Sequence, residues 1–399
     1  MLPAFYQTTL RAHLSEKQCL TLQLLLLLIQ AHRQVKLSEL ASVFPQAIQQ
    51  RSRKRNLQRF LALPQLHLKL LWFPVLKFWL RQEVTGHRLN RQQRRHLKKL
   101  KHQKYGYWLI AMDRTQWQGR NIFMVTLVWG THALPLYWEV LNKMGNSNLK
   151  TQKRLLKAVL PLFKQHPVLV LGDREFHSPK LADWLDSKDI SFALRQKKDL
   201  HFKAPAEASY QELKSLGFQP GMSHFYQAIL CNKGDGLGPF NLAVYWKRKY
   251  RKKGPKDPWY ILTNLTDLQS TLAVYCCRWG IEQMFKDYKT SGYHLEATKV
   301  NETRFLALML LITLAYSFAT IQGQWLKKLR VDVYVGRIEK HQDKVSPQSE
   351  FSLGLYGQKW MYAMELWGEL ALQLMALKPH KRRYFQRGFE ALSLIQQAS

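Results

Sequence analysis

The stretch Tyr107-Trp-Leu-Ile-Ala-Met-Asp113 is continuously apolar and ends in an aspartate. A strand in the middle of a sheet, covered on both faces, has this composition because none of its side chains faces water. A second stretch of the same kind, Val168-Leu-Val-Leu-Gly172, runs directly into Asp173. The sequence therefore predicts two buried central strands, each followed by a carboxylate.

The segments around these two strands predict the rest of the sheet. Ile122–Trp129 and Ala133–Leu141 are rich in β-branched and aromatic residues, and short turns favour an antiparallel meander with the first strand. Helices are expected over residues 150–163 and 179–187, and a further strand is expected at Ile190–Arg195. Three antiparallel strands, helix, strand, helix and strand match the order of an α/β fold of the ribonuclease-H-like class, in which helices flank a mixed sheet.

The charge of the chain is strongly positive. Among 399 residues, 61 Lys and Arg against 27 Asp and Glu leave a net charge of +34. Such a field attracts polyanions, and nucleic acid is the commonest large one, although ribosomal and membrane-surface proteins share the feature. Residues 1–104 hold half of the excess, with 20 Lys and Arg against 3 Glu (20 − 3 = 17). Dense runs at Arg51–Arg55, Arg91–Lys101 and Lys247–Lys253 predict salt-sensitive binding to a phosphate backbone.

These patterns divide the chain into five predicted regions. Residues 1–104 have helical periodicity and a basic surface, residues 196–258 mix Gly, Pro and Lys with short strand candidates, and the chain after Val300 is mainly helical. The expected regions are a basic helical DNA-binding domain (1–104), the first part of the ribonuclease-H-like core (105–195), a β-rich insertion (196–258), the second part of the core (259–330) and a helical C-terminal region (331–399).

The cysteines and the apolar runs indicate in which cellular compartment the protein is expected. Cys19, Cys231, Cys276 and Cys277 have neither zinc-ligand spacing nor the pattern of a disulfide framework, which fits a reducing cytoplasm. The first residues lack a basic segment followed by an apolar core, so no signal peptide is expected. Phe305–Ile321 contains four hydroxyl-bearing residues and is at the lower length limit for a membrane span, so a buried core helix is predicted there.

A third stretch, Tyr275-Cys-Cys-Arg278-Trp-Gly-Ile-Glu282-Gln-Met-Phe-Lys-Asp-Tyr-Lys289, spaces a phenol, a guanidinium, a carboxylate and an amine at offsets 0, 3, 7 and 14. On an α-helix these four side chains fall within an arc of about 60°. The carboxylate suits a divalent metal, and the cations and hydroxyl suit phosphate oxygens. The plainer alternative is a solvated helix with an i, i+4 ion pair between Arg278 and Glu282. The helix is expected to begin near Asp267.

Asp113, Asp173 and Glu282 are the candidate catalytic residues. If the two buried strands are neighbours, the two aspartates lie side by side and the later helix can bring Glu282 over them. Three converging carboxylates suit two Mg²⁺ or Mn²⁺ ions, which can activate a water or 3′-hydroxyl and stabilise the leaving oxygen of a phosphoryl transfer. A lone Asp at a strand end is more often a turn or cap residue. Glu139 and Glu175 are alternative acids, of which Glu139 is expected to face solvent and Glu175 to support the site.

The chain resembles the DDE transposases of bacterial insertion sequences, specifically the insertion-sequence-4 family. The signature of that family is Tyr-x2-Arg-x3-Glu-x6-Lys, and Tyr275–Lys289 matches it without a spacing error. The likeness is specific over about residues 107–300. Within this range, Met112–Thr115 resembles the first catalytic Asp block, Gly172–Phe176 the second, Trp259–Thr263 the strand before the signature helix, and Gly292–Glu296 the segment after its Lys.

The resemblance implies roles for eight residues. The catalytic and metal-binding residues would be Asp113, Asp173 and Glu282, and the DNA-binding residues Tyr275, Arg278, Lys289, Trp259 and Arg195. In relatives that cut DNA through a hairpin intermediate, a flipped base stacks on a Trp at the position of Trp259. A core Trp is the alternative, and Trp259 lies fewer residues before the signature Tyr than in the best-known hairpin-forming relative.

The resemblance also implies a function. The chain is expected to be a cut-and-paste DNA transposase that binds terminal inverted repeats, cleaves with two Mg²⁺ or Mn²⁺ ions and joins the 3′-hydroxyls to target DNA. It would act as a homodimer in a synaptic complex, in the bacterial cytoplasm and associated with the nucleoid, with no membrane partner. Two alternatives stay open, a ribonuclease-H-like nuclease or resolvase that cleaves without joining, and a non-catalytic DNA-binding derivative of a transposase.

Overall fold

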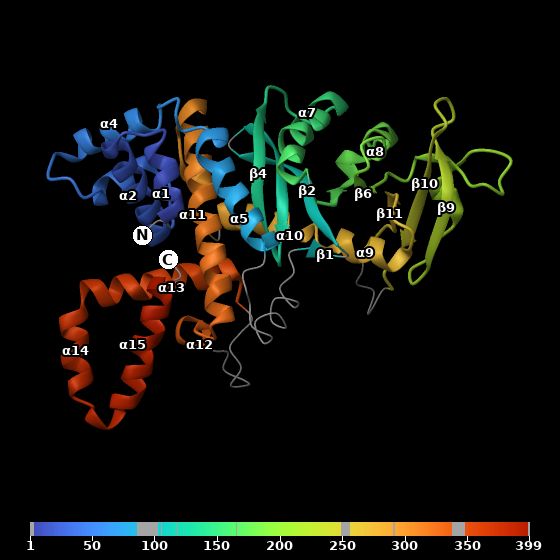
Figure 1. Cartoon of the computed structure of the whole chain (residues 1–399). Helices are drawn as coiled ribbons and strands as arrows, with labels where there is room; N and C mark the ends of the chain where they lie inside the picture. The colour runs from blue at the N-terminus through green and yellow to red at the C-terminus, as the bar shows by residue number, and fades with distance from the viewer. Residues whose placement is uncertain are drawn as a thin grey trace. The chain divides into compact units, whose positions relative to one another are not determined.

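The computed structural model describes residues 4–85, 103–104, 106–117, 119–164, 166–248, 256–289, 292–336 and 348–397 (Figure 1). The chain forms two compact units. One unit combines both ends of the chain, Met1–His96 and Lys286–Ser399, and the other is Leu97–Phe285. The basic run at Arg91–Lys101 and most of the run at Lys247–Lys253 lie outside the described residues.

A single mixed sheet is the framework of the Leu97–Phe285 unit. Its spatial order is β4-β3-β2-β5-β6-β11-β10-β9-β7-β8, with β1 paired to β2. The strands are β1 (Gln103–Lys104), β2 (Tyr107–Trp117), β3 (Arg120–Trp129), β4 (His132–Leu141), β5 (Val168–Gly172), β6 (Ser191–Arg195), β7 (His201–Lys203), β8 (Gln211–Glu212), β9 (Ser223–Cys231), β10 (Leu237–Tyr245) and β11 (Trp259–Thr263).

Five of these strands have the predicted connectivity. β2, β3 and β4 form an antiparallel meander, β5 lies parallel to β2, and β6 lies parallel to β5. Every residue of β5 is buried, as are residues 108–112 of β2, which is why both stretches are apolar without alternation. The predicted ribonuclease-H-like core is confirmed.

The strands within residues 196–258 widen the same sheet. β11 returns antiparallel to β6, and β10, β9 and β7 follow in antiparallel succession. The β-rich stretch predicted here therefore extends the edge of the core sheet. The division of the chain into the five predicted regions stays a prediction.

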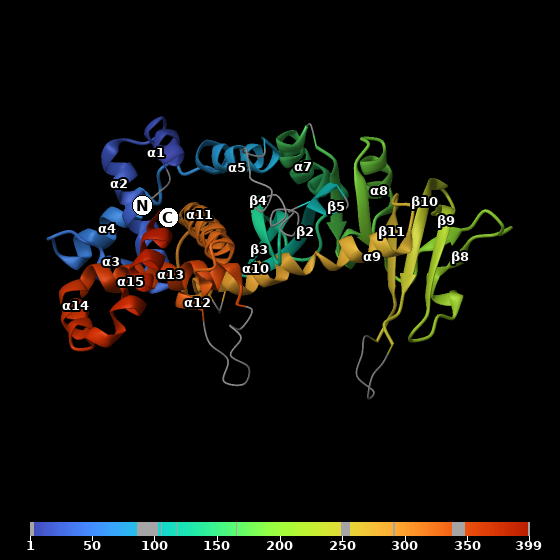
Figure 2. The same cartoon turned by 60° about the horizontal axis from the view of Figure 1, so that its bottom comes forward.

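Helices lie on both faces of the sheet. Figure 2 shows α7 (Leu149–Val159) and α8 (Pro179–Asp186) on one side and α9 (Leu268–Cys276) and α10 (Trp279–Lys289) on the other. Three short 3-10 helices, η2 (Leu160–Phe163), η3 (Arg174–Phe176) and η4 (Leu213–Leu216), complete the Leu97–Phe285 unit. α7 buries its apolar stripe against the sheet and leaves its basic residues outside, as an amphipathic helix does.

The described residues of the unit made of the two chain ends form helices and connecting loops, without strands. Its long helix α11 (Glu302–Lys328) contacts α2 (Glu16–His32) and α13 (Glu350–Leu366). The remaining helices are α1 (Ala4–Arg11), α3 (Leu37–Val43), α4 (Gln50–Phe60), η1 (Leu68–Trp72), α5 (Phe73–Thr85), η5 (Leu295–Ala297), α12 (Asp332–Val335), α14 (Gly368–Ala376), η6 (Pro379–Lys381) and α15 (Arg382–Gln397). α4 carries the basic run Arg51–Arg55 of the predicted helical region, with Leu57 and Phe60 buried on its apolar edge.

Two glycines bring α11 and α13 into backbone contact. A Cβ atom on Gly323 would lie 1.7 Å from the carbonyl oxygen of Glu350, and one on Gly354 would lie 1.8 Å from that of Ala319. Within the described residues, α11 is the one helix long and apolar enough to cross a membrane, and 83% of its apolar window is buried inside the protein. The predicted core helix at Phe305–Ile321 is thus confirmed.

Candidate active site

Asp113 and Asp173 follow the same step of the β2–β5 ladder. The parallel pairing of the two strands ends at Met112 and Gly172, and each aspartate is the next residue. The expectation that the first strand ends at Asp113 was wrong, since β2 continues to Trp117. What ends there is its pairing with β5, because the chain turns away after Gly172 while β2 stays paired with β3.

Nearby backbone N–H groups orient both carboxylates. Oδ1 of Asp113 accepts a hydrogen bond from the N–H of Arg114 at 2.7 Å. Oδ1 of Asp173 accepts from the N–H of Glu175 at 2.9 Å and thereby caps η3. In each case one carboxylate oxygen is held by the backbone, which leaves the other oxygen for a ligand or cation.

The helix expected from near Asp267 to Lys289 is interrupted. α9 ends at Cys276 and α10 begins at Trp279. Around the break, the N–H groups of residues 277, 278, 280 and 281 donate to carbonyls three residues earlier, as in a 3-10 turn. A straight α-helix with all four signature side chains on one stripe was therefore a wrong expectation, because a tighter turn changes the angle between successive residues.

The break lies next to β4, and a glycine permits this. A Cβ atom on Gly280 would lie 2.4 Å from the carbonyl oxygen of His132. Contacts this short between a Cβ and backbone cannot be relieved by rotating a side chain. Gly280 thus sets how closely the start of α10, which carries Glu282, approaches the sheet.

The guanidinium of Arg278 bridges two of the three acids. Its Nη2 lies 2.5 Å from Oε1 of Glu282, and its Nη1 lies 3.5 Å from Oδ2 of Asp113. The i, i+4 ion pair of the plainer alternative is present, but Arg278 is buried and also contacts an acid on β2. This helix face is therefore part of an acidic site and is not simply a solvated surface.

The three acids share one electrostatic field. Burial, the negative charge of Asp173 and, less strongly, that of Glu282 together raise the pKa of Asp113 to about 7. The N–H of Arg114 and the guanidinium of Arg278 act in the opposite direction but do not compensate. Negative charge is thus in excess where Asp113, Asp173 and Glu282 meet.

A divalent cation fits this donor set. Mg²⁺ and Mn²⁺ prefer carboxylate oxygens, and the excess negative charge around Asp113 is what such an ion neutralises. In the described ranges, no three His, Cys, Asp or Glu side chains already stand in metal-binding geometry. Arg278, which contacts both Asp113 and Glu282, occupies part of the space between them.

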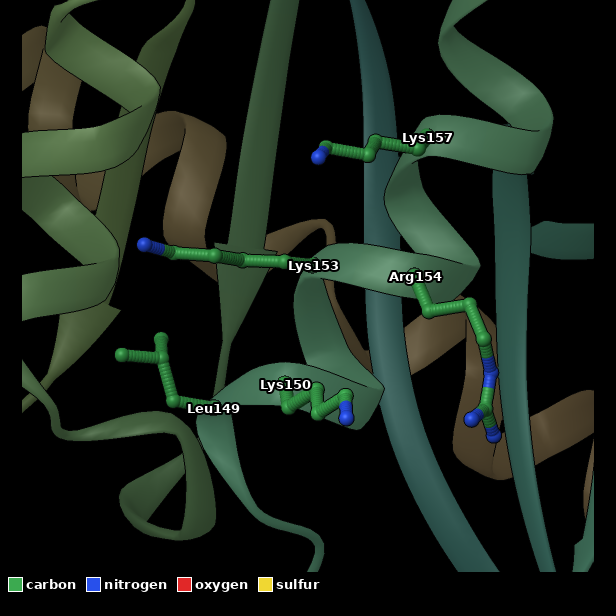
Figure 3. A pocket seen from close by; sticks show the side chains of 5 residues that line it. All are labelled: Leu149, Lys150, Lys153, Arg154 and Lys157. Carbon is green, nitrogen blue, oxygen red and sulfur yellow. The ribbon is translucent and has the colours of Figure 1, made fainter.

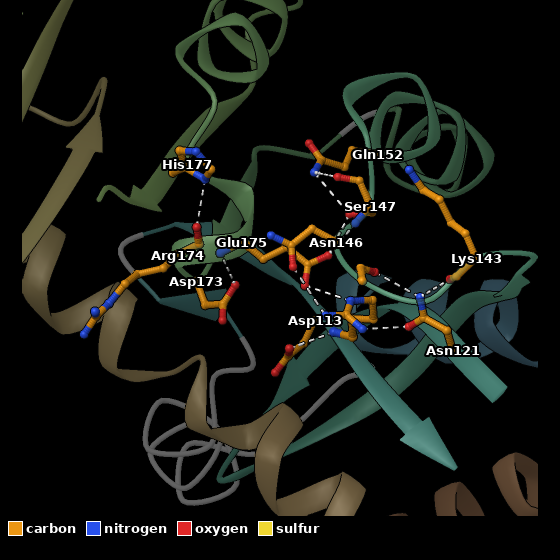
Figure 4. A network of polar contacts seen from close by, with 12 residues as sticks. Asp113, Asn121, Lys143, Asn146, Ser147, Gln152, Asp173, Arg174, Glu175 and His177 are labelled. Carbon is orange, nitrogen blue, oxygen red and sulfur yellow. Dashed lines mark hydrogen bonds and ion pairs between the residues drawn. The ribbon is translucent and has the colours of Figure 1, made fainter. Parts of the chain in front are cut away.

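A polar network supports the backbone beside the two aspartates (Figure 4). Nε of Arg114 donates to Oε2 of Glu175 at 2.9 Å, which joins β2 to η3. Oε1 of Glu175 accepts from the N–H and hydroxyl of Ser147, at 2.9 Å and 2.8 Å. Arg114 also donates to Asn121 at 2.8 Å, and Asn121 holds the carbonyls of Lys143 and Gly145.

The two alternative acids are engaged elsewhere. Both oxygens of Glu175 accept hydrogen bonds from Arg114 and Ser147, in agreement with a supporting role. Glu139 on β4 forms an ion pair with Arg154 of α7 and accepts from the hydroxyl of Tyr137. Glu282, by contrast, is one of the charges that raise the pKa of Asp113.

Arg195, Trp259, Tyr275 and Arg278 form a group that we call the Trp259 cluster. Arg195 ends β6 and Trp259 begins the neighbouring β11. The Trp259 ring lies edge-on to Tyr275, with centroids 5.2 Å apart, and the guanidinium carbon of Arg195 lies 5.9 Å from the Trp259 ring. Arg278 lies 6.0 Å from the Tyr275 ring and connects the cluster to the acids.

Exposure differs within the cluster. Tyr275 is 3% exposed, and burial raises the pKa of its phenol, while Arg278 and Arg195 lower it in part. Trp259 and Arg195 are half-buried, so each presents some surface to a ligand. Lys289 ends α10 in the unit of the chain ends, where its Nζ lies 3.7 Å from Oε1 of Glu296. A contact of Lys289 with DNA stays a prediction.

A family model described as a transposase DDE domain matches residues 84–318, which is more than half of the chain. The chain belongs to this DDE transposase family. Among solved structures, a piggyBac transposase in a synaptic complex with hairpin DNA is similar over 98% of this chain and 81% of that chain, with 13% identity and a TM-score of 0.43. No match was found among curated proteins.

Membership of the DDE transposase family implies a metal-dependent enzyme that cleaves DNA. The matched residues include the three acids and the Trp259 cluster. Arg114, Asn121 and Ser147 were not predicted as site residues. A signal for Arg114 existed, because it directly follows Asp113 after a buried apolar run, where an unpaired cation is seldom found. Asn121 and Ser147 gave none, since their roles depend on how β3 and the loop before α7 meet Glu175.

Proposed function

We propose that this DDE transposase is a cut-and-paste enzyme of the insertion-sequence-4 family that uses Asp113, Asp173 and Glu282 as metal ligands. The observation that carries the proposal is the convergence of these acids, since Asp113 and Asp173 follow the same step of the β2–β5 ladder and Arg278 bridges Asp113 and Glu282. Two Mg²⁺ or Mn²⁺ ions would activate the attacking oxygen and stabilise the leaving oxygen of an in-line phosphoryl transfer. The spacing of Tyr275, Arg278, Glu282 and Lys289 supports the family assignment.

The residues of the chain have separable tasks in this proposal. The Arg114 and Glu175 N–H groups hold one oxygen of each aspartate, so the other oxygens face the reacting phosphate. Arg278 exchanges its contact with Asp113, which is long at 3.5 Å, for a phosphate oxygen of the transposon end. Arg195 and Trp259 contact the same DNA end, Lys289 binds a further phosphate, and the basic helix α4 contributes to end recognition.

A hairpin intermediate is the finer part of the proposal. Trp259 is half-buried, with the guanidinium of Arg195 over its ring and the Tyr275 ring in T-shaped contact beside it. A flipped base would stack on the part of the indole face that Arg195 now covers, and stacking on an aromatic ring tolerates any base. Arg195 would then move to a phosphate.

Two copies of the chain would associate in the synaptic complex through α14. Leu370, Leu372 and Leu374 of α14 and its C-cap residue Leu377 are 56–77% exposed, and no charged residue lies between Leu370 and Leu377. A helix of this composition is normally buried, and DNA phosphates do not cover leucines. Leu366 and Trp367, which are 72% and 57% exposed, directly precede this helix and add to its exposed apolar side chains. A second copy is the occupant we propose, because two transposon ends must be held together.

Cleavage of a labelled duplex that carries the element's own end tests the proposal. Wild type, Glu282→Ala and Glu139→Ala are compared with Mg²⁺, with binding to the same duplex measured in parallel. We expect wild type and Glu139→Ala to cut and Glu282→Ala to bind without cutting, because a two-metal site loses nearly all turnover without one ligand. Joining of the cut ends to a target plasmid separates a transposase from a nuclease that only cleaves.

Two other outcomes of this cleavage experiment would contradict the proposal. If Glu282→Ala cuts as fast as wild type while Glu139→Ala does not, the third acid is Glu139 and the site assignment is wrong. If all three proteins bind the end and none cuts, the chain is a non-catalytic DNA-binding derivative.

A further inference from the structure

An open hollow of about 690 Å³ lies along α7 (Figure 3). Its lining consists of Leu149 and four cations, Lys150, Lys153, Arg154 and Lys157, which we call the basic face of α7. Lys150, Arg154 and Lys157 are exposed, and Lys153 is half-buried. No acid from the part of the chain that the structure describes lines the hollow, so its surroundings suit a polyanion.

Two of the four cations have contacts that an anion could replace. Arg154 forms an exposed ion pair with Glu139, and such pairs are weak and screened by salt. Nζ of Lys153 lies 5.7 Å from the Trp184 ring. Among the described residues, Arg154 alone of these four cations is paired with an acid, so the protein neutralises only part of the charge of the hollow.

The sheet order separates the basic face of α7 from the Trp259 cluster. In the order β4-β3-β2-β5-β6-β11, Asp113 and Asp173 follow the central pair β2 and β5. The Trp259 cluster takes Arg195 and Trp259 from β6 and β11, on one side of this pair. α7 packs on β3 and β4, on the other side. The acids thus lie between two different cationic surfaces of the same unit.

The basic face of α7 also begins near the carboxyl end of β5, where the acids lie. η2 and a short connection lead from the end of α7 into the start of β5, so the start of α7 lies near the carboxyl end of that strand. A chain of hydrogen bonds confirms the closeness. Gln152 of α7 donates to Ser147 at 3.1 Å, Ser147 donates to Glu175, and the N–H of Glu175 donates to Asp173.

We infer that the basic face of α7 binds the backbone of the flanking DNA, on the far side of the scissile phosphate from the transposon end. The inference rests on the proposed function, in which the Trp259 cluster holds the transposon end and the acids hold the scissile phosphate. Neighbouring strands are about 4.8 Å apart, so β4 lies about 15 Å from β5, within a few nucleotides of the reacting bond. Lys150 and Lys157 are about 10 Å apart along the helix, which is about three base-pair steps.

Two duplexes and two double variants test this assignment. One duplex carries the element's end followed by a full helical turn of flanking DNA, and the other carries the same end without a flank. The test variant is Lys150→Gln/Lys157→Gln. The control is Lys164→Gln/Lys188→Gln, which removes the same charge from exposed residues that precede β5 and β6, at the edge of the sheet opposite the acids. Thermal unfolding checks that both variants fold.

We expect wild type and the control to bind the flanked duplex more tightly than the flankless one, and the test variant to lose most of this difference. For the flanked duplex, the slope of log affinity against log salt should fall by about 1.8, or about 0.9 for each phosphate that the variant no longer neutralises. Binding of the flankless duplex should not change.

Three results would overturn the inference. An equal loss on both duplexes would place the basic face of α7 on the transposon end, and no loss on either would make it a solvated surface. If the test variant still prefers the flanked duplex but no longer joins cut ends to a target, the basic face of α7 binds target DNA instead. If wild type binds the element's end no more tightly than a scrambled duplex and does not cut it, the proposed function fails. This result appears before any variant is compared.

Discussion

Arg114 and Glu175 form an ion pair, with Nε 2.9 Å from Oε2, that ties β2 next to Asp113 to η3 next to Asp173. Arg114 directly follows the first aspartate, and Glu175 lies two residues after the second. The side chains are 15% and 10% exposed, so water screens the pair little. The spacing of the two aspartates therefore depends on a contact that neither of them makes.

Replacing Glu175 should damage the site through its geometry. Glu175→Gln keeps the shape but leaves the guanidinium of Arg114 without its charge partner, which should lower the free energy of unfolding by about 1–3 kcal/mol. Glu139→Gln, which breaks the exposed pair with Arg154, should cost less than about 1 kcal/mol. Urea unfolding compares the two. Binding of Mn²⁺ without DNA should weaken in Glu175→Gln alone, and equal Mn²⁺ affinity in both variants would argue against a positioning role.

The stability of the metal-free protein should depend on Asp113. Because its pKa is about 7 in the folded state against 3.8 ordinarily, the folded protein binds more protons than the unfolded chain between these values. The free energy of unfolding should therefore fall as pH rises through this window, by up to about 4 kcal/mol. Asp113→Asn removes this loss and should be more stable than wild type above pH about 7 in the presence of a chelator.

A suitable control for that experiment is Asp189→Asn, which changes an exposed carboxylate in the turn before β6. Its unfolding curve should follow wild type at every pH. If Asp113→Asn is no more stable than wild type on the alkaline side, the charge conflict among the three acids does not exist in solution.

Gly280→Ala should displace the start of α10. The new Cβ would meet the carbonyl oxygen of His132 at 2.4 Å, and overpacking of this kind costs about 1–3 kcal/mol. The rate of cleavage should fall by more than the loss of stability alone explains, because the displacement of α10 moves Glu282. Gly388→Ala in α15, where nothing lies within 4 Å of the new Cβ, should instead stabilise the protein by about 0.5–1 kcal/mol. Thermal unfolding and end cleavage of both variants check this, and full activity of Gly280→Ala would contradict it.

Leu370→Gln/Leu374→Gln should weaken association of two copies. Burial of two leucines in an interface contributes enough that their loss should weaken the dimer on DNA at least about tenfold. Sedimentation of the protein with the element's end measures the effect. Leu20→Gln on α2 changes a leucine that is 53% exposed and should leave association unaltered. If both variants associate as strongly as wild type, α14 is not part of the dimer interface.

Much of the core could be predicted because its signals are local. The apolar runs before Asp113 and Asp173 reflect burial on both faces, and burial of this kind dictates composition. The continuous helix around Arg278 was a wrong expectation for a related reason. Helical periodicity extends across Cys277 without Pro, and the interruption is made by i to i−3 hydrogen bonds beside β4 that periodicity does not record.

Residue type and order were enough to specify the ribonuclease-H-like sheet, the spacing of the signature from Tyr275 to Lys289, and the strong positive charge. Three relationships emerged only from the folded chain. Arg278 bridges Glu282 and Asp113, Glu175 is occupied by Arg114, and the basic face of α7 lies across the acids from Trp259. These relationships join residues up to 165 positions apart. Their distances are set by sheet register and helix packing, which no single stretch of sequence encodes.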